Sequence, residues 1–79
     1  MEIQNWYLIV DNEHQEVLDW QEKKADANYL LRHRYYDCRI VCACCAEDDD
    51  YSSPWACGKT FAEARKNLKA GIFDNWMDY

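Results

Sequence analysis

The feature that most constrains this chain is a change in the spacing of its apolar residues, which occurs twice. Residues 6–20 hold two short apolar runs around a polar segment, and from about Lys24 the apolar residues recur at helical spacing. Residues 38–57 again contain strand-like runs, and residues 60–77 again show helical spacing. A strand buries alternate residues, whereas a helix buries every third or fourth, so the pattern predicts the element order ββαββα.

The first half reads as a hairpin followed by a helix. The polar residues Asp11–Gln15 separate two apolar runs, which is typical of a β-hairpin with a polar tip. A competing interpretation extends a single helix from Asn12 to Tyr36, but it would place the charge of Lys24 on the apolar stripe of that helix. We therefore expect the hairpin, and then a helix with one apolar face. That face holds Ala27, Leu30, Leu31 and Tyr35.

The second half begins with the run CRIVCACCA, residues 38–46, which carries no charge after Arg39. Its small and β-branched residues predict a buried strand. The acidic residues 47–50 lead into a solvated loop, and residues 55–57 are expected to return as a short strand.

The clearest predicted element is a helix over residues 60–77. Thr60 and Glu63 have the spacing of a capping box, in which each side chain bonds an otherwise unpaired amide at the helix start. Gly71 lies inside the predicted helix, where it costs about 1 kcal/mol relative to Ala. The apolar stripe consists of Phe61, Ala64, Leu68, Ile72 and Trp76.

These elements predict a single α+β domain over residues 1–79. The expected architecture is a four-stranded, mostly antiparallel sheet with two helices packed on one face. The two halves also resemble each other at an offset of 37 residues, with Ala25-Asp26-Ala27 matching Ala62-Glu63-Ala64. Chance similarity between two such units and true duplication both lead to this architecture.

Composition and charge limit the function. Fifteen acidic residues against nine basic ones give a net charge of −6, which repels nucleic acid and anionic membranes and attracts basic partners. No apolar stretch approaches the roughly 20 residues that a membrane span needs. The N-terminal residues 1–10 lack the basic start and apolar core of a signal peptide, so we expect a cytoplasmic protein with reduced thiols.

The residues that most suggest chemistry have simpler explanations. Cys42, Cys44 and Cys45 fall in a predicted strand that alternates faces, so they are expected to pack as small apolar residues. The GKT sequence at residues 58–60 lacks the earlier glycine of a phosphate-binding loop, because Ser53 stands there. The sequence therefore predicts no enzyme, no metal site and no cofactor.

Two other functions stay open. The five cysteines, 38, 42, 44, 45 and 57, could form a metal-binding module, because thiolates are natural zinc ligands. The basic and aromatic segment Arg32–Arg39 could bind single-stranded nucleic acid by stacking on bases. The net charge argues against direct nucleic-acid binding, so protein binding is preferred.

Residues 54–72, PWACGKTFAEARKNLKAGI, resemble the strand-to-helix junction of HicB-type antitoxins. That family has a Pro-Gly-Cys turn, a short strand, a Gly-Asp-Thr sequence and a helix rich in Glu-Ala and Asn. Here Lys59 replaces the Asp of that pattern. The resemblance implies a small acidic protein that masks a toxin nuclease. By type alone, the chain is also similar to small acidic inhibitors encoded by phages, such as anti-CRISPR proteins.

The predicted function is therefore binding, and inhibition, of a partner protein whose basic surface engages nucleic acid. Acidic residues at the two hairpin tips would steer the partner, and exposed aromatic residues would anchor it. An exposed edge strand would also allow pairing with a second copy, which gives a homodimer. The predicted contacts are Asp11, Glu13, Glu47, Asp48, Asp49, Asp50, Tyr51, Trp55, Trp76 and Tyr79.

Overall fold

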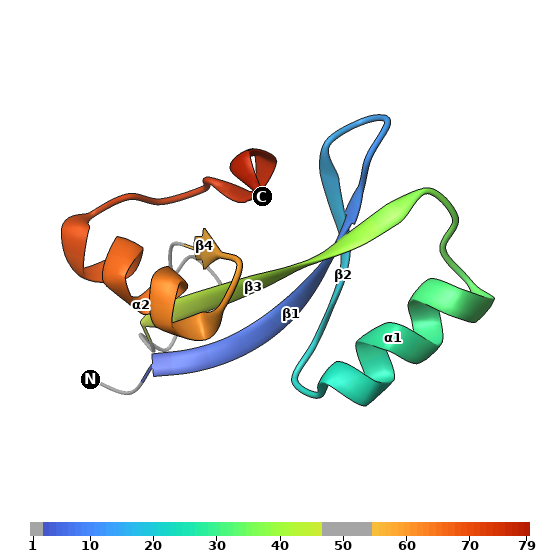
Figure 1. Cartoon of the computed structure of the whole chain (residues 1–79), viewed down its shortest axis with the longest axis horizontal. Coiled ribbons are helices and arrows are strands. Elements are labelled where there is room, and N and C mark those ends of the chain that lie inside the picture. The colour runs from blue at the N-terminus through green and yellow to red at the C-terminus, as the bar shows by residue number, and fades with distance from the viewer. Residues whose placement is uncertain (1–2, 47–54) are drawn as a thin grey trace.

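The computed structural model describes residues 3–46 and 55–79, and its elements follow the predicted order ββαββα (Figure 1). The four strands form one antiparallel sheet in the order β2-β1-β3-β4, which confirms the predicted α+β fold. The elements are β1 (Ile3–Asp11), β2 (Glu16–Gln21), α1 (Lys24–His33), β3 (Cys38–Ala46), β4 (Ala56–Gly58), α2 (Phe61–Ala70) and the 3-10 helix η1 (Trp76–Asp78).

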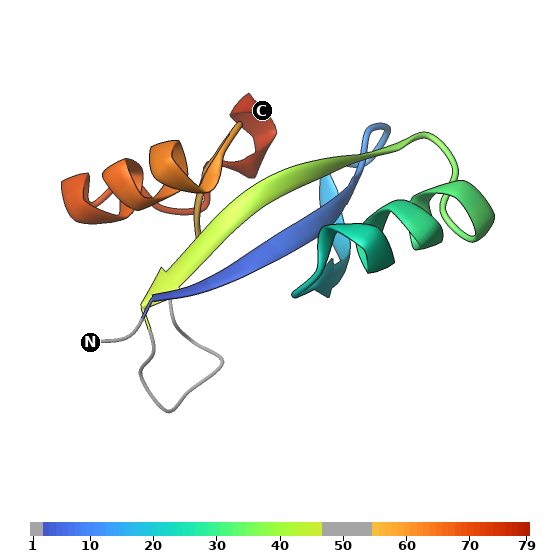
Figure 2. The ribbon, with the colours of Figure 1, turned by 60° about the horizontal axis from the view of Figure 1, so that its bottom comes forward.

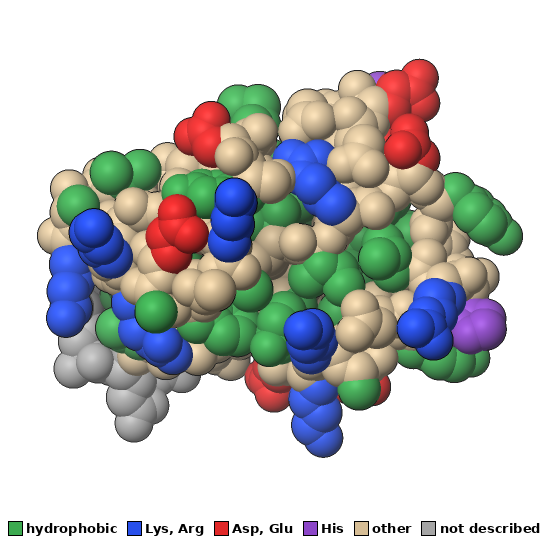
Figure 3. Space-filling view, viewed as in Figure 1, with side chains coloured by type: hydrophobic (Ala, Val, Ile, Leu, Met, Phe, Trp, Pro, Cys, Tyr) green, Lys and Arg blue, Asp and Glu red, His purple; other side chains and the backbone are tan. Residues whose placement is uncertain are grey.

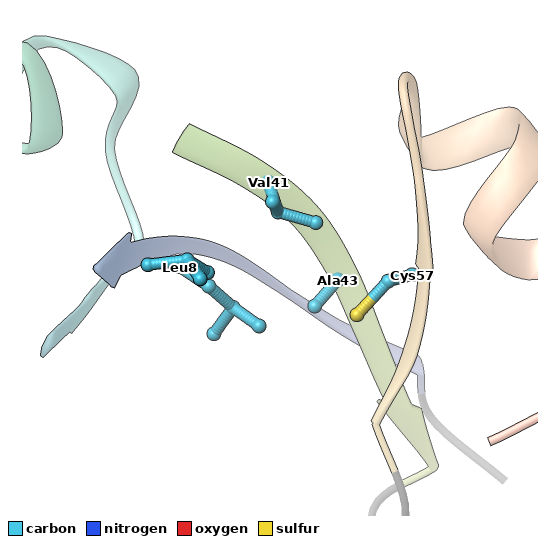
Figure 4. Close-up of a cluster of buried hydrophobic side chains, with 5 residues drawn as sticks. Leu8, Val41, Ala43 and Cys57 are labelled. Carbon is cyan, nitrogen blue, oxygen red and sulfur yellow. The ribbon is translucent and has the colours of Figure 1, made fainter. Parts of the chain in front are cut away.

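The central strands β1 and β3 pair along their whole length, from Ile3 opposite Ala46 to Asp11 opposite Cys38. Alternate residues of these strands point to opposite faces of the sheet. One face holds the main buried cluster, four of whose members are labelled in Figure 4. The cluster consists of Leu8, Val10, Val41, Ala43 and Cys57.

Both helices pack on the other face. The Phe61 ring of α2 meets the Tyr7 ring of β1 edge-on, with centroids 4.9 Å apart. At the far end of the same face, Asp19 lies opposite Ile9 and accepts a 3.1 Å hydrogen bond from the hydroxyl of Tyr35, just beyond α1. Figures 1 and 2 show the two helices at opposite ends of the long axis of the molecule.

The helix α2 ends at Ala70, so the predicted helix over residues 60–77 is wrong beyond Ala70. Gly71 has a φ of 76°, in the left-handed region that glycine adopts without a steric penalty. The amides of Gly71 and Ile72 donate to the carbonyls of Leu68 and Asn67, at 3.2 and 2.9 Å. This arrangement satisfies the last carbonyls of the helix and turns the chain away, so Gly71 terminates the helix.

The chain beyond α2 closes the outer edge of β4. The amide of Asp74 donates to the carbonyl of Trp55 at 2.7 Å. The buried side chain of Asn75 accepts from the Cys57 amide at 2.7 Å and donates to the Cys57 carbonyl at 3.0 Å. These bonds take the place of a neighbouring strand, and Trp76 and Tyr79 then pack against the buried cluster.

The other edge strand, β2, is blunted in a different way. Its pairing with β1 is shifted between Ile9 and Val10, so Leu18 has no partner across the ladder. The Asp19 carboxylate accepts from the Trp20 amide at 2.8 Å, which occupies a donor that a further strand would need. A bulge and an acidic side chain are two devices by which proteins prevent edge-to-edge pairing. The homodimer through an exposed edge strand therefore stays a prediction without support from this edge.

Candidate functional site: an acidic pole beside the first hairpin

The tip of the β1–β2 hairpin is fixed by local bonds. Asp11 accepts from the Glu13 amide at 3.0 Å, and its other carboxylate oxygen lies 2.7 Å from Nδ1 of His14. The bond from His14 lowers the pKa of Asp11, and the same bond raises the pKa of His14. The amide of Gln15 also donates to the carbonyl of Asp11 at 2.8 Å. The tip therefore presents its side chains in a defined arrangement.

Arg39 fastens the C-terminal segment to this tip. Its guanidinium donates to the side chains of Asn12 and Gln15, at 2.7 and 2.8 Å. It also donates to the main-chain oxygens of Trp76, at 3.2 Å, and Tyr79. Since its donors are taken up inside the fold, Arg39 holds two segments together and is poorly placed to bind an external phosphate.

Five acidic residues lie on the segments that meet at this junction, and we call them the acidic pole: Asp11, Glu13, Glu16, Asp37 and Asp78. Asp11 lies directly opposite Glu16 in the hairpin, and the carbonyl of Asp37 accepts from the Asn12 amide at 3.0 Å. Asp78 lies between Trp76 and Tyr79 in the chain, whose main-chain oxygens Arg39 binds. All but Asp11 are exposed. Figure 3 shows acidic side chains at the hairpin tip, whereas Lys and Arg lie mostly over the helices.

Cations offset the pole only in part: Arg39 stands at the junction and His14 pairs with Asp11. Over residues 3–46 and 55–79, the one ion pair within 4.0 Å is that of Asp11 with His14, and no Lys or Arg pairs with an acid. Like charges that lie close together repel each other, which costs stability unless a partner neutralises them. The pole is therefore poised to attract a cationic surface.

The second predicted acidic tip joins the sheet at the other end. Glu47, Asp48, Asp49, Asp50 and Tyr51 lie outside the described residues. Ala46, which precedes them, lies opposite Ile3, and Asp11 is at the far end of the same strand. Nine residues of strand span roughly 26 Å, so the two predicted tips attach to opposite ends of the sheet.

The predicted aromatic anchors serve mainly as packing. Trp55 is half-buried and meets Trp6 edge-on, with ring centroids 6.2 Å apart. Trp76 and Tyr79 are also half-buried and lie against the core, and the Tyr79 hydroxyl donates to Glu63 at 2.9 Å. Each ring leaves only part of its surface for a partner.

Other apolar side chains near the pole are more exposed, and sequence reasoning did not select them as contacts. Trp20 is 48% exposed and Leu18 is 40% exposed, both on β2 of the same hairpin. Met77, next to Asp78 in η1, is 62% exposed. Alternation along β2 could not reveal this exposure, because the bulge at Leu18 depends on the pairing with β1.

The cysteines lie on both faces of the sheet; Cys44, Cys45 and Cys57 are buried, whereas Cys38 and Cys42 are partly exposed. Burial raises the pKa of Cys57 to about 12, and burial also raises the pKa of the Cys44 thiol, which donates to Asn5 at 3.0 Å. Within the described residues, no three His, Cys, Asp or Glu side chains are placed to hold a metal ion. Thiols with raised pKa values are poor nucleophiles, so these residues offer little for catalysis.

The GKT sequence lies where β4 ends and α2 begins. The Thr60 hydroxyl accepts from the Glu63 amide at 3.3 Å, which confirms the helix cap. The Glu63 carboxylate in turn accepts a hydrogen bond from the amide of Lys59, one residue before the cap, at 3.2 Å. Gly58 lies in β4 and not in a turn, and α2 packs directly against it.

Comparison with protein-family models, with curated proteins and with solved structures finds no match for this chain. Among the described residues, no helix is long and apolar enough to cross a membrane.

Proposed function

We propose that this protein is a non-catalytic module that binds and inhibits a partner protein with a basic surface, and that the acidic pole is its contact surface. The observation that carries the proposal is the gathering of five acids around one junction, without a Lys or Arg ion pair in the described part of the chain. Electrostatic steering by such a surface speeds association with a cationic partner.

The apolar side chains on the same segments supply binding affinity that surface charge alone does not. Surface acids contribute little affinity, because water screens them, whereas a large desolvated ring contributes much more. Trp20 lies on the hairpin strand that begins at Glu16, Met77 precedes Asp78 in the chain, and both are about half exposed or more. A partner that covers both the acids and these side chains would have a polar rim and an apolar centre.

The class of partner follows from the chemistry of the pole. A surface that attracts closely spaced carboxylates also attracts phosphates, so a basic surface that engages nucleic acid is the natural target. The module would then act as an antitoxin or as a phage or mobile-element inhibitor, by covering the surface that the nucleic acid needs. The resemblance of residues 54–72 to HicB-type antitoxins is compatible with this role.

Affinity purification from the native host tests the proposal. The wild type is compared with a pole variant, Glu13→Lys with Asp78→Lys, and with a matched control, Glu22→Lys with Asp26→Lys, which changes the net charge equally. We expect the wild type and the control to retain a protein of high isoelectric point, and the pole variant to lose it at least tenfold. Equal retention by all three proteins, or a retained partner that is acidic, contradicts the proposal.

A further inference from the structure

The outer surface of α1 carries a cluster of aromatic and cationic side chains that the proposed function does not use. Tyr29 and His33 are one helical turn apart, and their rings meet in a tilted arrangement, with centroids 4.5 Å apart at an angle of 39°. Tyr29 is 63% exposed, and Tyr36, just beyond the helix, is 83% exposed. Ala27 alone in this helix is fully buried, so these rings contribute little to the core.

Two arginines accompany the rings. Arg32 and Arg34 are exposed, and neither forms an ion pair within 4.0 Å or a side-chain hydrogen bond with any residue of 3–46 or 55–79. The third cation that the sequence groups with them, Arg39, is bonded inside the fold. The cluster of free groups is therefore Tyr29, Arg32, His33, Arg34 and Tyr36, which we call the α1 platform.

The strongest objection to an anionic ligand here is the net charge of −6. Most of that charge, however, belongs to acidic residues in segments that are not attached to α1. Ten of the fifteen acids and all nine bases lie in the described residues, which leaves a net charge of −1 there. The other five acids are Glu2 and Glu47–Asp50, attached at Ile3 and Ala46, whereas α1 leads into Cys38 at the opposite end of β3. That strand is roughly 26 Å long, against a screening length of about 8 Å in physiological salt.

We propose that the α1 platform binds single-stranded nucleic acid. Exposed rings accept unpaired bases of any sequence, and guanidinium groups bind the phosphates between them. An acidic protein segment would pair with the two arginines, but its carboxylates would not stack on the three exposed rings. This inference does not depend on the proposed function: Asp37 of the acidic pole follows Tyr36 directly in the chain, but the two surfaces share no residue.

Fluorescence anisotropy of a labelled single-stranded oligothymidylate tests the platform, at about 50 mM salt, where phosphate contacts are strong. The variant Arg32→Ala with Arg34→Ala should weaken binding about tenfold and reduce the slope of log affinity against log salt by about two. Tyr29→Ala should weaken binding by about fivefold or more and leave that slope unchanged, because a ring neutralises no phosphate.

Three controls make the result decisive. Lys66→Ala with Lys69→Ala removes two exposed cations from α2 and should change affinity less than twofold. A duplex of mixed sequence should bind more weakly than the single strand, because its bases are already stacked. Polyglutamate should compete poorly. No binding by the wild type, equal loss in the α2 control, equal binding of duplex or equal competition by polyglutamate each overturns the inference. Circular dichroism confirms that every variant is folded.

Discussion

Gly58 lies where β4 passes beneath the first turn of α2, and this close approach explains the residue better than any phosphate site. A Cβ atom at this position would come within 2.8 Å of the Ala64 amide nitrogen and of the Glu63 Cβ. Gly58→Ala should therefore lower the free energy of unfolding by about 2 kcal/mol, because strand and helix must separate. Urea denaturation measures this change.

Gly71→Ala is the matched comparison. A Cβ atom there meets nothing within 4 Å, but the φ of 76° penalises any other residue. The left-handed conformation costs about 1 kcal/mol, so this variant should be destabilised less than Gly58→Ala. An equal or larger loss at Gly71 would show that helix packing against Gly58 is not tight.

The pair of Asp11 and His14 gives the hairpin tip a pH dependence. The pKa of His14 is raised from its ordinary 6.5, so its stabilising contribution is complete below that value and is lost as the pH rises through the folded pKa. The pKa of Asp11 is lowered from 3.8, so its contribution holds above that value and is lost as the pH falls through the folded pKa. The pair therefore stabilises the tip most at pH values between the folded pKa of Asp11 and the folded pKa of His14.

NMR titration of the imidazole signals tests the pair. The midpoint of His14 should lie above 6.5 in the wild type and should fall in Asp11→Asn, which removes the charge but keeps the shape. A midpoint that Asp11→Asn leaves unchanged would mean that the two side chains do not interact in solution.

At the scale of elements, the Asn75 side chain makes hydrogen bonds to β4 that a neighbouring strand would otherwise make. Asn75→Ala would leave the buried Cys57 amide without an acceptor, whereas the Cys57 carbonyl would keep its 2.8 Å bond from Asn67. One buried unpaired donor costs about 2 kcal/mol, which urea denaturation should detect. Asn28→Ala in α1, where no side-chain hydrogen bond is found within the described residues, should cost less than about 0.5 kcal/mol. Similar losses in both variants would refute the role of Asn75 at the edge.

The opposite edge of the sheet, β2, gives a second prediction. Asp19→Ala would free the Trp20 amide and remove a negative charge from β2, so this strand could pair with a second copy. Sedimentation velocity over a range of concentrations should show association in Asp19→Ala and a monomer-like species in Glu22→Ala, which removes an equal charge nearby. Identical sedimentation of both variants would show that Asp19 does not protect the edge.

The elements themselves were predictable because their signals are local. The uncharged run after Arg39 gives β3 with the predicted bounds of Cys38–Ala46, and Thr60 caps α2 as expected. The end of α2 was missed because Ile72 and Trp76 continue the helical spacing by coincidence, whereas Gly71 stops the helix. An apolar stripe records burial, and Trp76 is partly buried for a different reason, as a cover for the sheet.

At the scale of the whole molecule, the candidate site could not be predicted from local patterns. The pole exists because Arg39 connects residues that are far apart in the chain, and the nearest of them, Gln15, is separated from it by 24 positions. Which acids share a surface depends on the register of β1 with β3, and that register places Asp11 and Ala46 at opposite ends. Charge alone indicated a basic partner, but only the pairing of strands shows which acids can meet it together.

The most direct test of this account is competition for the partner that the wild type retains. The pole and the nucleic acid should exclude each other, because both require the same cationic surface. We predict that saturating the purified partner with its nucleic acid releases the wild-type protein, and that Glu13→Lys with Asp78→Lys fails to displace that nucleic acid. The variant Arg32→Ala with Arg34→Ala decides the question, because it lacks the phosphate contacts of the α1 platform; simultaneous binding of this variant and the nucleic acid to the partner would contradict the account.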